Sequence, residues 1–323
     1  MKKNLFLLGL LVCSMATMAQ TEKADKPESW YFKLGGSYFN QTASTEFPTV
    51  GGQPANRDVY EGTLANNKLV SREGVTGSFG QGFRSGITAG YRFSTRLGVE
   101  VAANYYNSNT KTMAQTTDRL ISYNPAQSPA ATYLDFTAEG RIKAFDIAPA
   151  LVMFLGEAHG FEPYTKVGVI VPIHGTLDIE TNRTYTTFAG ANQVALTEAY
   201  SKDVVKPNAT IGFMASVGTS YKLGKHISAF AELEYRNFTV HGKTKETEAY
   251  TENGVDKLDV ATTFRPDASY SAKHTNYVEK ITNTSNSKTT NAAGFDNTKA
   301  TDDISTYVGI SGLGLTVGLK YSL

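Results

Sequence analysis

The sequence is nearly free of cysteine and tryptophan, with Cys13 and Trp30 as its only examples among 323 residues. Cys13 lies in a segment that we expect to be removed on export, which would leave the mature chain without a thiol. This excludes disulfide bonds, thiolate metal ligands and a cysteine nucleophile. Stability must therefore come from side-chain packing and backbone hydrogen bonds.

The sequence also lacks an excess of charge of one sign, because its 31 lysines and arginines nearly balance its 30 aspartates and glutamates. Nucleic-acid binding needs a clear basic excess, so nucleic acid is excluded as a partner. The five histidines are scattered, without the short paired spacing of a metal site. The sequence thus predicts neither a metal site nor a cofactor.

Long apolar runs are confined to the N-terminus. Lys2 and Lys3 precede a short apolar stretch, residues 5–12, and small residues follow at Thr17 and Ala19. This order is typical of an export signal, and the apolar stretch is too short to span a bilayer as a helix. We predict a signal peptide over residues 1–19, an N-terminal periplasmic segment over 20–29 and a β-barrel over 30–323.

A lipoprotein signal that uses Cys13 is the alternative at this end. Leu11 and Val12 precede that cysteine, where such a site prefers small residues. The ordinary signal peptide is therefore favoured.

Alternation of apolar with polar or small residues dominates the rest of the chain. It is clearest at the C-terminus, where residues 313–323 carry leucine, valine or tyrosine at every odd position. This is the period of a β-strand with one apolar face. Strands of soluble proteins average about five or six residues, whereas about ten residues cross a membrane at a tilt. The length favours a membrane-spanning strand.

Eight stretches share this pattern, and the connections between them are alternately long and short. The stretches are 30–40, 86–93, 97–106, 141–155, 161–173, 210–223, 226–238 and 312–323, and the long connections are 41–83, 107–139, 176–206 and 242–306. Short turns at one rim and long loops at the other are typical of outer-membrane barrels. We predict an all-β fold, an eight-stranded antiparallel up-and-down transmembrane β-barrel with four long extracellular loops.

Two other folds remain open at this stage. The barrel has ten strands if residues 75–83 or 185–200 add a further pair. In a soluble sandwich, the apolar face would be the core and the polar face would meet solvent. The last long connection, 242–306, is rich in Thr, Asn, Lys and Ser, so we expect a flexible or extended segment that need not pack.

Charges of both signs occupy the face opposite the apolar one and would point into the barrel lumen. An eight-stranded barrel has little interior space, so we favour a paired plug over a conducting lining. Aromatic residues near the strand ends predict two interfacial girdles. The lumen charges are Arg92, Glu100, Asp146, Lys166, Glu232, Glu234, Arg236 and Lys320; the girdle residues are Trp30, Tyr91, Phe93, Tyr221 and Tyr321 at one interface, and Tyr105, Tyr38, Phe238 and Tyr307 at the other.

Catalysis at a barrel rim would need a histidine beside a serine or a carboxylate. His174 and His241 fall at predicted strand ends, with Asp178, Glu180 and Ser201 in the neighbouring loop. None of them lies in a recognisable acyltransferase, deacylase or protease motif. We predict no enzyme and no catalytic residue.

Three segments resemble the outer-membrane β-barrel domain family of Gram-negative bacteria, the small barrels of the OmpX and OmpA type. They are GFEPYTKVGVIVPI (160–173), ISAFAELEYRNF (227–238) and the terminal strand 312–323, which carries Tyr321. The family usually ends in phenylalanine, where this chain has Leu323. The resemblance implies outer-membrane localisation, contact with outer-membrane lipids and insertion by the barrel assembly machinery.

The family does not imply one activity. The long loops predict a structural or surface-interaction role at the cell surface, through adhesion or shielding, with an extracellular ligand as a possible partner. A narrow porin-like channel for small solutes is the first alternative. A barrel enzyme that acts on lipid or peptide is the second.

Overall fold

The computed structural model describes residues 29–62, 66–124, 128–208 and 210–323. The predicted signal peptide, 1–19, lies outside the described residues, as does nearly all of the segment 20–29.

Eight of the described strands close into a ring, in which every strand is antiparallel to both neighbours. The ring closes because the first strand, β1, pairs with the last, β19, in register from Tyr31–Ser322 to Gln41–Gly312. In ring order the strands are β1 (Ser29–Gln41), β6 (Gly82–Arg92), β7 (Leu97–Ser108), β9 (Ser128–Phe154), β10 (Phe161–Ala189), β12 (Gly212–Lys222), β13 (Ile227–Asn237) and β19 (Gly312–Ser322).

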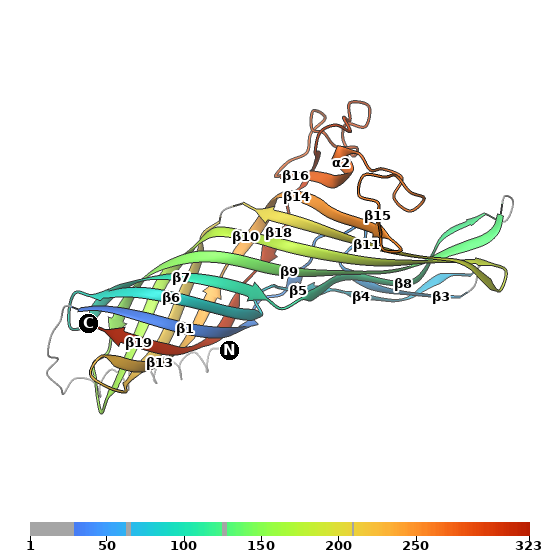
Figure 1. Ribbon diagram of the computed structural model, residues 1–323. Coiled ribbons are helices and arrows are strands. Elements are labelled where there is room, and N and C mark those ends of the chain that lie inside the picture. Colours follow the sequence, from blue (N-terminus) through green and yellow to red (C-terminus); the bar gives the residue numbers. More distant parts are fainter. Residues whose placement is uncertain (1–28, 63–65, 125–127, 209) are drawn as a thin grey trace.

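The two rims of the ring differ. At one rim the connections 93–96, 155–160 and 223–226 are short, and the end of the chain is tied down there by a hydrogen bond from Leu323 N to Trp30 O of 3.0 Å. At the other rim β9 and β10 continue far beyond their ring partners (Figure 1).

The alternation in the sequence decides which side chains lie inside the ring. Apolar residues such as Ile87, Phe213 and Leu315 are 57–64% exposed on the outside, whereas the inward charged residues Arg84 and Lys320 are buried. A soluble sandwich requires the opposite arrangement, so that interpretation is wrong.

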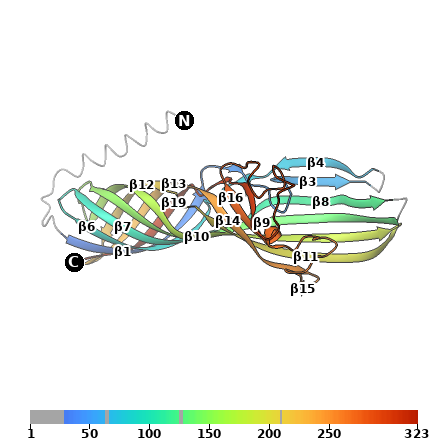
Figure 2. The same ribbon diagram turned by 90° about the horizontal axis from the view of Figure 1, so that it is seen from above.

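Beyond the ring, the chain forms a long sheet that we call the extension. Residues 177–189 of β10 pair with β11 (Asn192–Pro207), which pairs in turn with β14 (Thr239–Glu252). On the other side, β8 (Lys111–Asn124) pairs with the start of β9 and lies parallel to β3 (Asn56–Glu61), which pairs with β4 (Lys68–Gly74). Ring and extension form one continuous sheet, and Figure 2 shows them end to end.

Two of the four segments predicted as long loops, 107–139 and 176–206, are largely strands, and the predicted bounds of β9 and β10 were too short. The ten-strand alternative is also wrong. Residues 185–200 form the β10–β11 hairpin in the extension, and 75–83 contribute only β5 (Thr76–Gly77), which pairs with β2 (Thr45–Glu46), and the start of β6. Neither segment adds a further strand to the ring.

Leu258, Phe264 and Tyr277 of the segment 242–306 pack against buried apolar residues of the extension, so the prediction that the segment need not pack is wrong for this part of it. It contains β15 (Val255–Asp256), α2 (Tyr270–Lys273), β16 (His274–Val278) and β17 (Thr301–Ile304), and β18 (Tyr307–Gly309) follows. Its polar side chains close turns: Asn286 Nδ2 donates to Asp296 O and Ala300 O, both at 2.9 Å.

The extension has its own apolar core. Phe136 and Ala138 of β9, Ile179 and Tyr185 of β10 and Tyr250 of β14 belong to one buried cluster, which reaches Phe238 and Ile310 at the rim of the ring. Because it buries apolar side chains of several strands, the extension is a packed body and not a set of independent loops.

Candidate functional site

The interior of the ring is filled by ion pairs. Two lysines and two glutamates from four strands form the largest group: Lys33 Nζ lies 2.5 Å from Glu100 and 3.1 Å from Glu232. Lys166 Nζ lies 2.6 Å from Glu232 and 3.4 Å from Glu100. Each charge therefore meets two charges of opposite sign across the ring, as buried ions require.

Two further groups flank it. Toward the extension, Arg84 donates to both carboxylate oxygens of Glu234 at 2.6 Å, and Arg236 lies 2.9 Å from Asp146. Toward the short turns, Glu162 pairs with Arg92 and, at 3.1 Å, with Lys320. The three groups occupy successive levels of the barrel.

Little space remains between these groups. The cavity beside Lys33, Arg84 and Glu232 measures about 30 Å³. A cavity needs at least roughly 10–15 Å³ to hold one water molecule, so this space suits one or two waters and not a path for solutes. In planar bilayers we accordingly expect no single-channel conductance steps from the wild-type protein, and regular steps at neutral pH would contradict a filled interior.

Each of the eight charges predicted to face the lumen lies in one of these groups. Sequence reasoning missed Lys33, Arg84 and Glu162. Lys33 and Glu162 lie at inward positions of their strands, so the alternation of inward and outward residues could have predicted that they face the lumen. Arg84 was missed because the strand was predicted to begin at residue 86, whereas β6 begins at Gly82.

The aromatic residues predicted for one interface lie outside the ring near the short turns. Trp30 and Tyr91 are in contact with their ring centroids 5.0 Å apart, and Phe93, Tyr221 and Tyr321 are exposed. Near the other rim, Tyr105 is exposed and Tyr38 contacts Phe83. Tyr307 is exposed as well. The prediction for Phe238 is wrong: this residue follows the end of β13 and turns into the apolar cluster at the rim, where it is 5% exposed.

The predicted catalytic candidates do not assemble into a triad. His241 Nδ1 contacts both Asn208 Nδ2 at 3.3 Å and Ser305 Oγ at 3.2 Å. In a triad the nucleophile and the orienting group bind different ring nitrogens, whereas here both partners share one. His174 lies elsewhere on the same pocket wall, Asp178 pairs with Lys143, and Ser201 accepts a hydrogen bond from Arg183. Glu180 is exposed on β10.

A pocket of about 480 Å³, which we call the extension pocket, lies on the extension. Its walls come from β9, β10, β11 and β14 and from the segment 263–272. Its lining contains three basic residues, Arg183, Lys245 and Arg265, and one acidic residue, Asp203. The pocket is therefore basic, and nothing in the local sequence around these distant residues indicated that they would meet.

Aromatic stacking and backbone contacts hold this pocket in shape. Tyr185 stacks on Phe264, with the ring centroids 3.8 Å apart and the planes at 9°. Arg265 donates to Leu258 O at 2.8 Å, and its guanidinium lies 4.9 Å from the centroid of Tyr250. Burial raises the pKa of Tyr185, which stays a neutral phenol at physiological pH.

One donor in the pocket has no acceptor. Arg265 Nη2 is buried and makes no hydrogen bond to any other described residue. A buried unsatisfied donor costs roughly 1–3 kcal/mol, and more when it is charged.

Across the described ranges, no group of three or more His, Cys, Asp or Glu side chains is arranged to hold a metal ion. No helix there is long and apolar enough to cross a membrane.

Comparisons with known proteins agree with the ring. A family model described as "Outer membrane protein beta-barrel domain" matches residues 5–270. Curated proteins give no match. Among solved structures, the outer membrane protein OprG from Pseudomonas aeruginosa aligns with 93% of this chain and 98% of its own, at 12% identity and a TM-score of 0.40, which is too low for any conclusion. Because the family model spans most of the sequence, this chain belongs to the outer membrane β-barrel domain family and is a protein of the bacterial outer membrane.

Proposed function

We propose that this protein is a surface-interaction protein: an eight-stranded transmembrane barrel that anchors a ligand-binding extension outside the cell. The observation that carries the proposal is the pairing of a filled ring with a packed, basic-lined extension. Short turns and the end of the chain share one rim, which in such barrels is the periplasmic one. This orientation directs the extension outward.

The lining of the extension pocket suggests the class of ligand. Three cations against one carboxylate favour an anion, and guanidinium groups bind carboxylates, sulfates and phosphates through paired hydrogen bonds. The stacked Tyr185 and Phe264 add a flat apolar wall. An acidic polysaccharide of a neighbouring surface has both the charges and the sugar faces that such a wall would contact.

Binding to immobilised dextran sulfate, with uncharged dextran as the reference, tests the proposal. We expect the purified folded protein to bind dextran sulfate selectively. Lys245→Gln removes a pocket cation that forms no ion pair with any described residue, and it is expected to weaken binding about tenfold. The matched control is Lys68→Gln, an exposed lysine of β4 outside the pocket, which should leave the affinity within about twofold.

The comparison of the two variants distinguishes a specific pocket from general charge attraction, and the salt dependence shows that the binding is electrostatic. A basic pocket predicts weaker binding at high ionic strength, since screening lengths fall to ~3 Å at 1 M salt. Equal binding to dextran and dextran sulfate, or equal losses in Lys245→Gln and Lys68→Gln, would contradict the proposed site.

A further inference from the structure

The wall of the ring is interrupted at one place. The pairing of β10 with β12 ends at Ile170–Gly212, and its pairing with β11 begins only at Leu177–Val205. Between them, residues 171–176 are paired with β9 on one side, and no other described strand pairs with them on the other. Six residues of a wall strand thus have a free edge at the border between ring and extension.

Two prolines explain the interruption. Pro172 and Pro207 lack the N–H that a ladder needs, and β10 bulges against β9 between Pro172 and His174. After Pro207 the chain turns toward β14, where Asn208 N donates to His241 O at 2.8 Å. The chain therefore moves away from β10 where it would otherwise close the wall.

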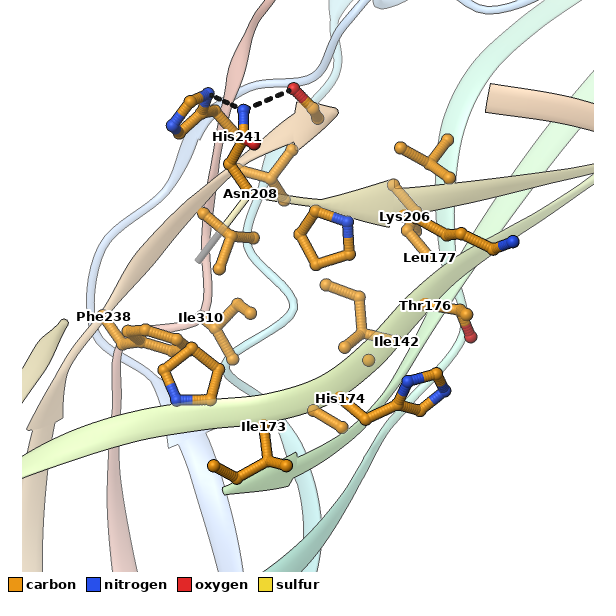
Figure 3. A pocket seen from close by; sticks show the side chains of 18 residues that line it. Ile142, Ile173, His174, Thr176, Leu177, Lys206, Asn208, Phe238, His241 and Ile310 are labelled. Carbon is orange, nitrogen blue, oxygen red and sulfur yellow. Dashed lines mark hydrogen bonds between the residues drawn. The ribbon is translucent and has the colours of Figure 1, made fainter. Parts of the chain in front are cut away.

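An apolar cavity of about 200 Å³, which we call the wall pocket, lies behind this interruption. Figure 3 shows Ile142, Leu177, Phe238 and Ile310 around it, and Val240 and Val308 complete its apolar side. A cavity of ~150 Å³ with such a lining stays dry and binds benzene. The wall pocket therefore has room for a slightly larger apolar group.

The edge of the wall pocket is polar and cationic. Lys206 and His174 are exposed there, and neither takes part in an ion pair with any described residue. The nearby pair Asn208 and His241 is already held by its mutual hydrogen bond (Figure 3). The free positive charge at the edge is thus that of Lys206.

We propose that the wall pocket binds a single-chain amphiphile with an anionic head, of the fatty-acid class. The end of the apolar chain lies among Phe238, Val240 and Ile310, and the carboxylate lies at Lys206. Binding in the wall pocket removes apolar surface of the fatty-acid chain from water, and the lysine adds a charge-assisted contact. The proposal does not depend on the extension pocket, since the two cavities share no lining residue.

Photolabelling tests this site. The probe is dodecanoic acid with a diazirine near its methyl end, added to the full-length protein in phospholipid vesicles. We expect saturable labelling at residues of β14, β18 and the segment around Phe238, suppressed by unlabelled dodecanoic acid. Labels spread evenly over the exposed apolar belt, and not suppressed by competitor, would overturn the proposal because they would indicate ordinary contact with lipid.

Two variants sharpen the test. Val240→Phe fills the pocket and is expected to lower labelling about tenfold, while Val217→Phe on the outside of β12 leaves it unchanged. Lys206→Gln should weaken labelling by the acid but not by the corresponding alcohol, and Lys225→Gln in a short turn is its control. Heat-modifiable gel migration checks that each variant is folded. If the folded Val240→Phe variant labels as the wild type does, the chain does not bind in this pocket.

Discussion

Glu232→Gln is expected to lower the free energy of unfolding by about 3–5 kcal/mol. Glu232 pairs with both Lys33 and Lys166 and accepts a hydrogen bond from Tyr164 at 2.8 Å. Glutamine keeps the shape but removes the charge, so two buried lysines would share the single carboxylate of Glu100. A buried cation that lacks a full counter-charge strongly destabilises the fold. In the wild type, the two lysines and two glutamates balance each other's charge.

Urea unfolding in phospholipid vesicles measures this change. Trp30 is the only tryptophan and lies on the outside of the ring, so its fluorescence reports transfer between lipid and water. The matched control is Glu248→Gln, which removes an exposed partner of Lys202 at 2.9 Å. An exposed pair contributes less than about 1 kcal/mol, and the control should change stability by no more than that.

The stability of the Glu232→Gln variant also indicates whether the barrel interior could conduct ions. If Glu232→Gln costs no more than Glu248→Gln, water must reach the lysines and screen them. The interior would then be hydrated, and the expected absence of conductance steps would lose its physical basis. A large and specific loss, by contrast, indicates a dry ion-paired plug.

The ring could be predicted from the sequence because each of its strands separates two environments. Residues such as Leu315 and Val317 face outward while Thr316 lies inside, and this contrast repeats at period two. The same parity placed Glu100, Glu232 and Lys320 inside. Which charge meets which could not be predicted, because the partners come from strands distant in the sequence.

The extension could not be predicted for a related reason. Past the ring, the contrast between the two faces of β9 reverses: Leu134 and Phe136 are buried inside the extension, whereas Asp135 lies on the opposite face. The pattern of apolar residues on the outer face therefore ends there, although the strands continue. The extension pocket brings together Arg183, Lys245 and Arg265 from three separate segments, and a single sequence carries no local signal of that meeting.

Gly318→Ala is expected to prevent normal closure of the barrel, with a loss of about 3 kcal/mol. Gly318 of β19 lies between its ring partners Gly35 of β1 and Phe230 of β13. A Cβ atom there would lie 2.1 Å from Leu34 O and 2.7 Å from a ring carbon of Phe230. Relief of the first contact requires movement of the backbone of β1, the strand with which β19 closes the ring.

Gel migration with and without heating measures closure, because a ring without an open strand edge resists detergent until it is heated. We expect Gly318→Ala to give mostly the unfolded band in outer-membrane fractions. The control is Gly224→Ala in the β12–β13 turn, where an added Cβ meets nothing within 4 Å, and which should migrate as the wild type does. A heat-modifiable band of full intensity for Gly318→Ala would mean that β1 and β19 do not approach each other in this register, and the predicted closing pair of the ring would have to be reassigned.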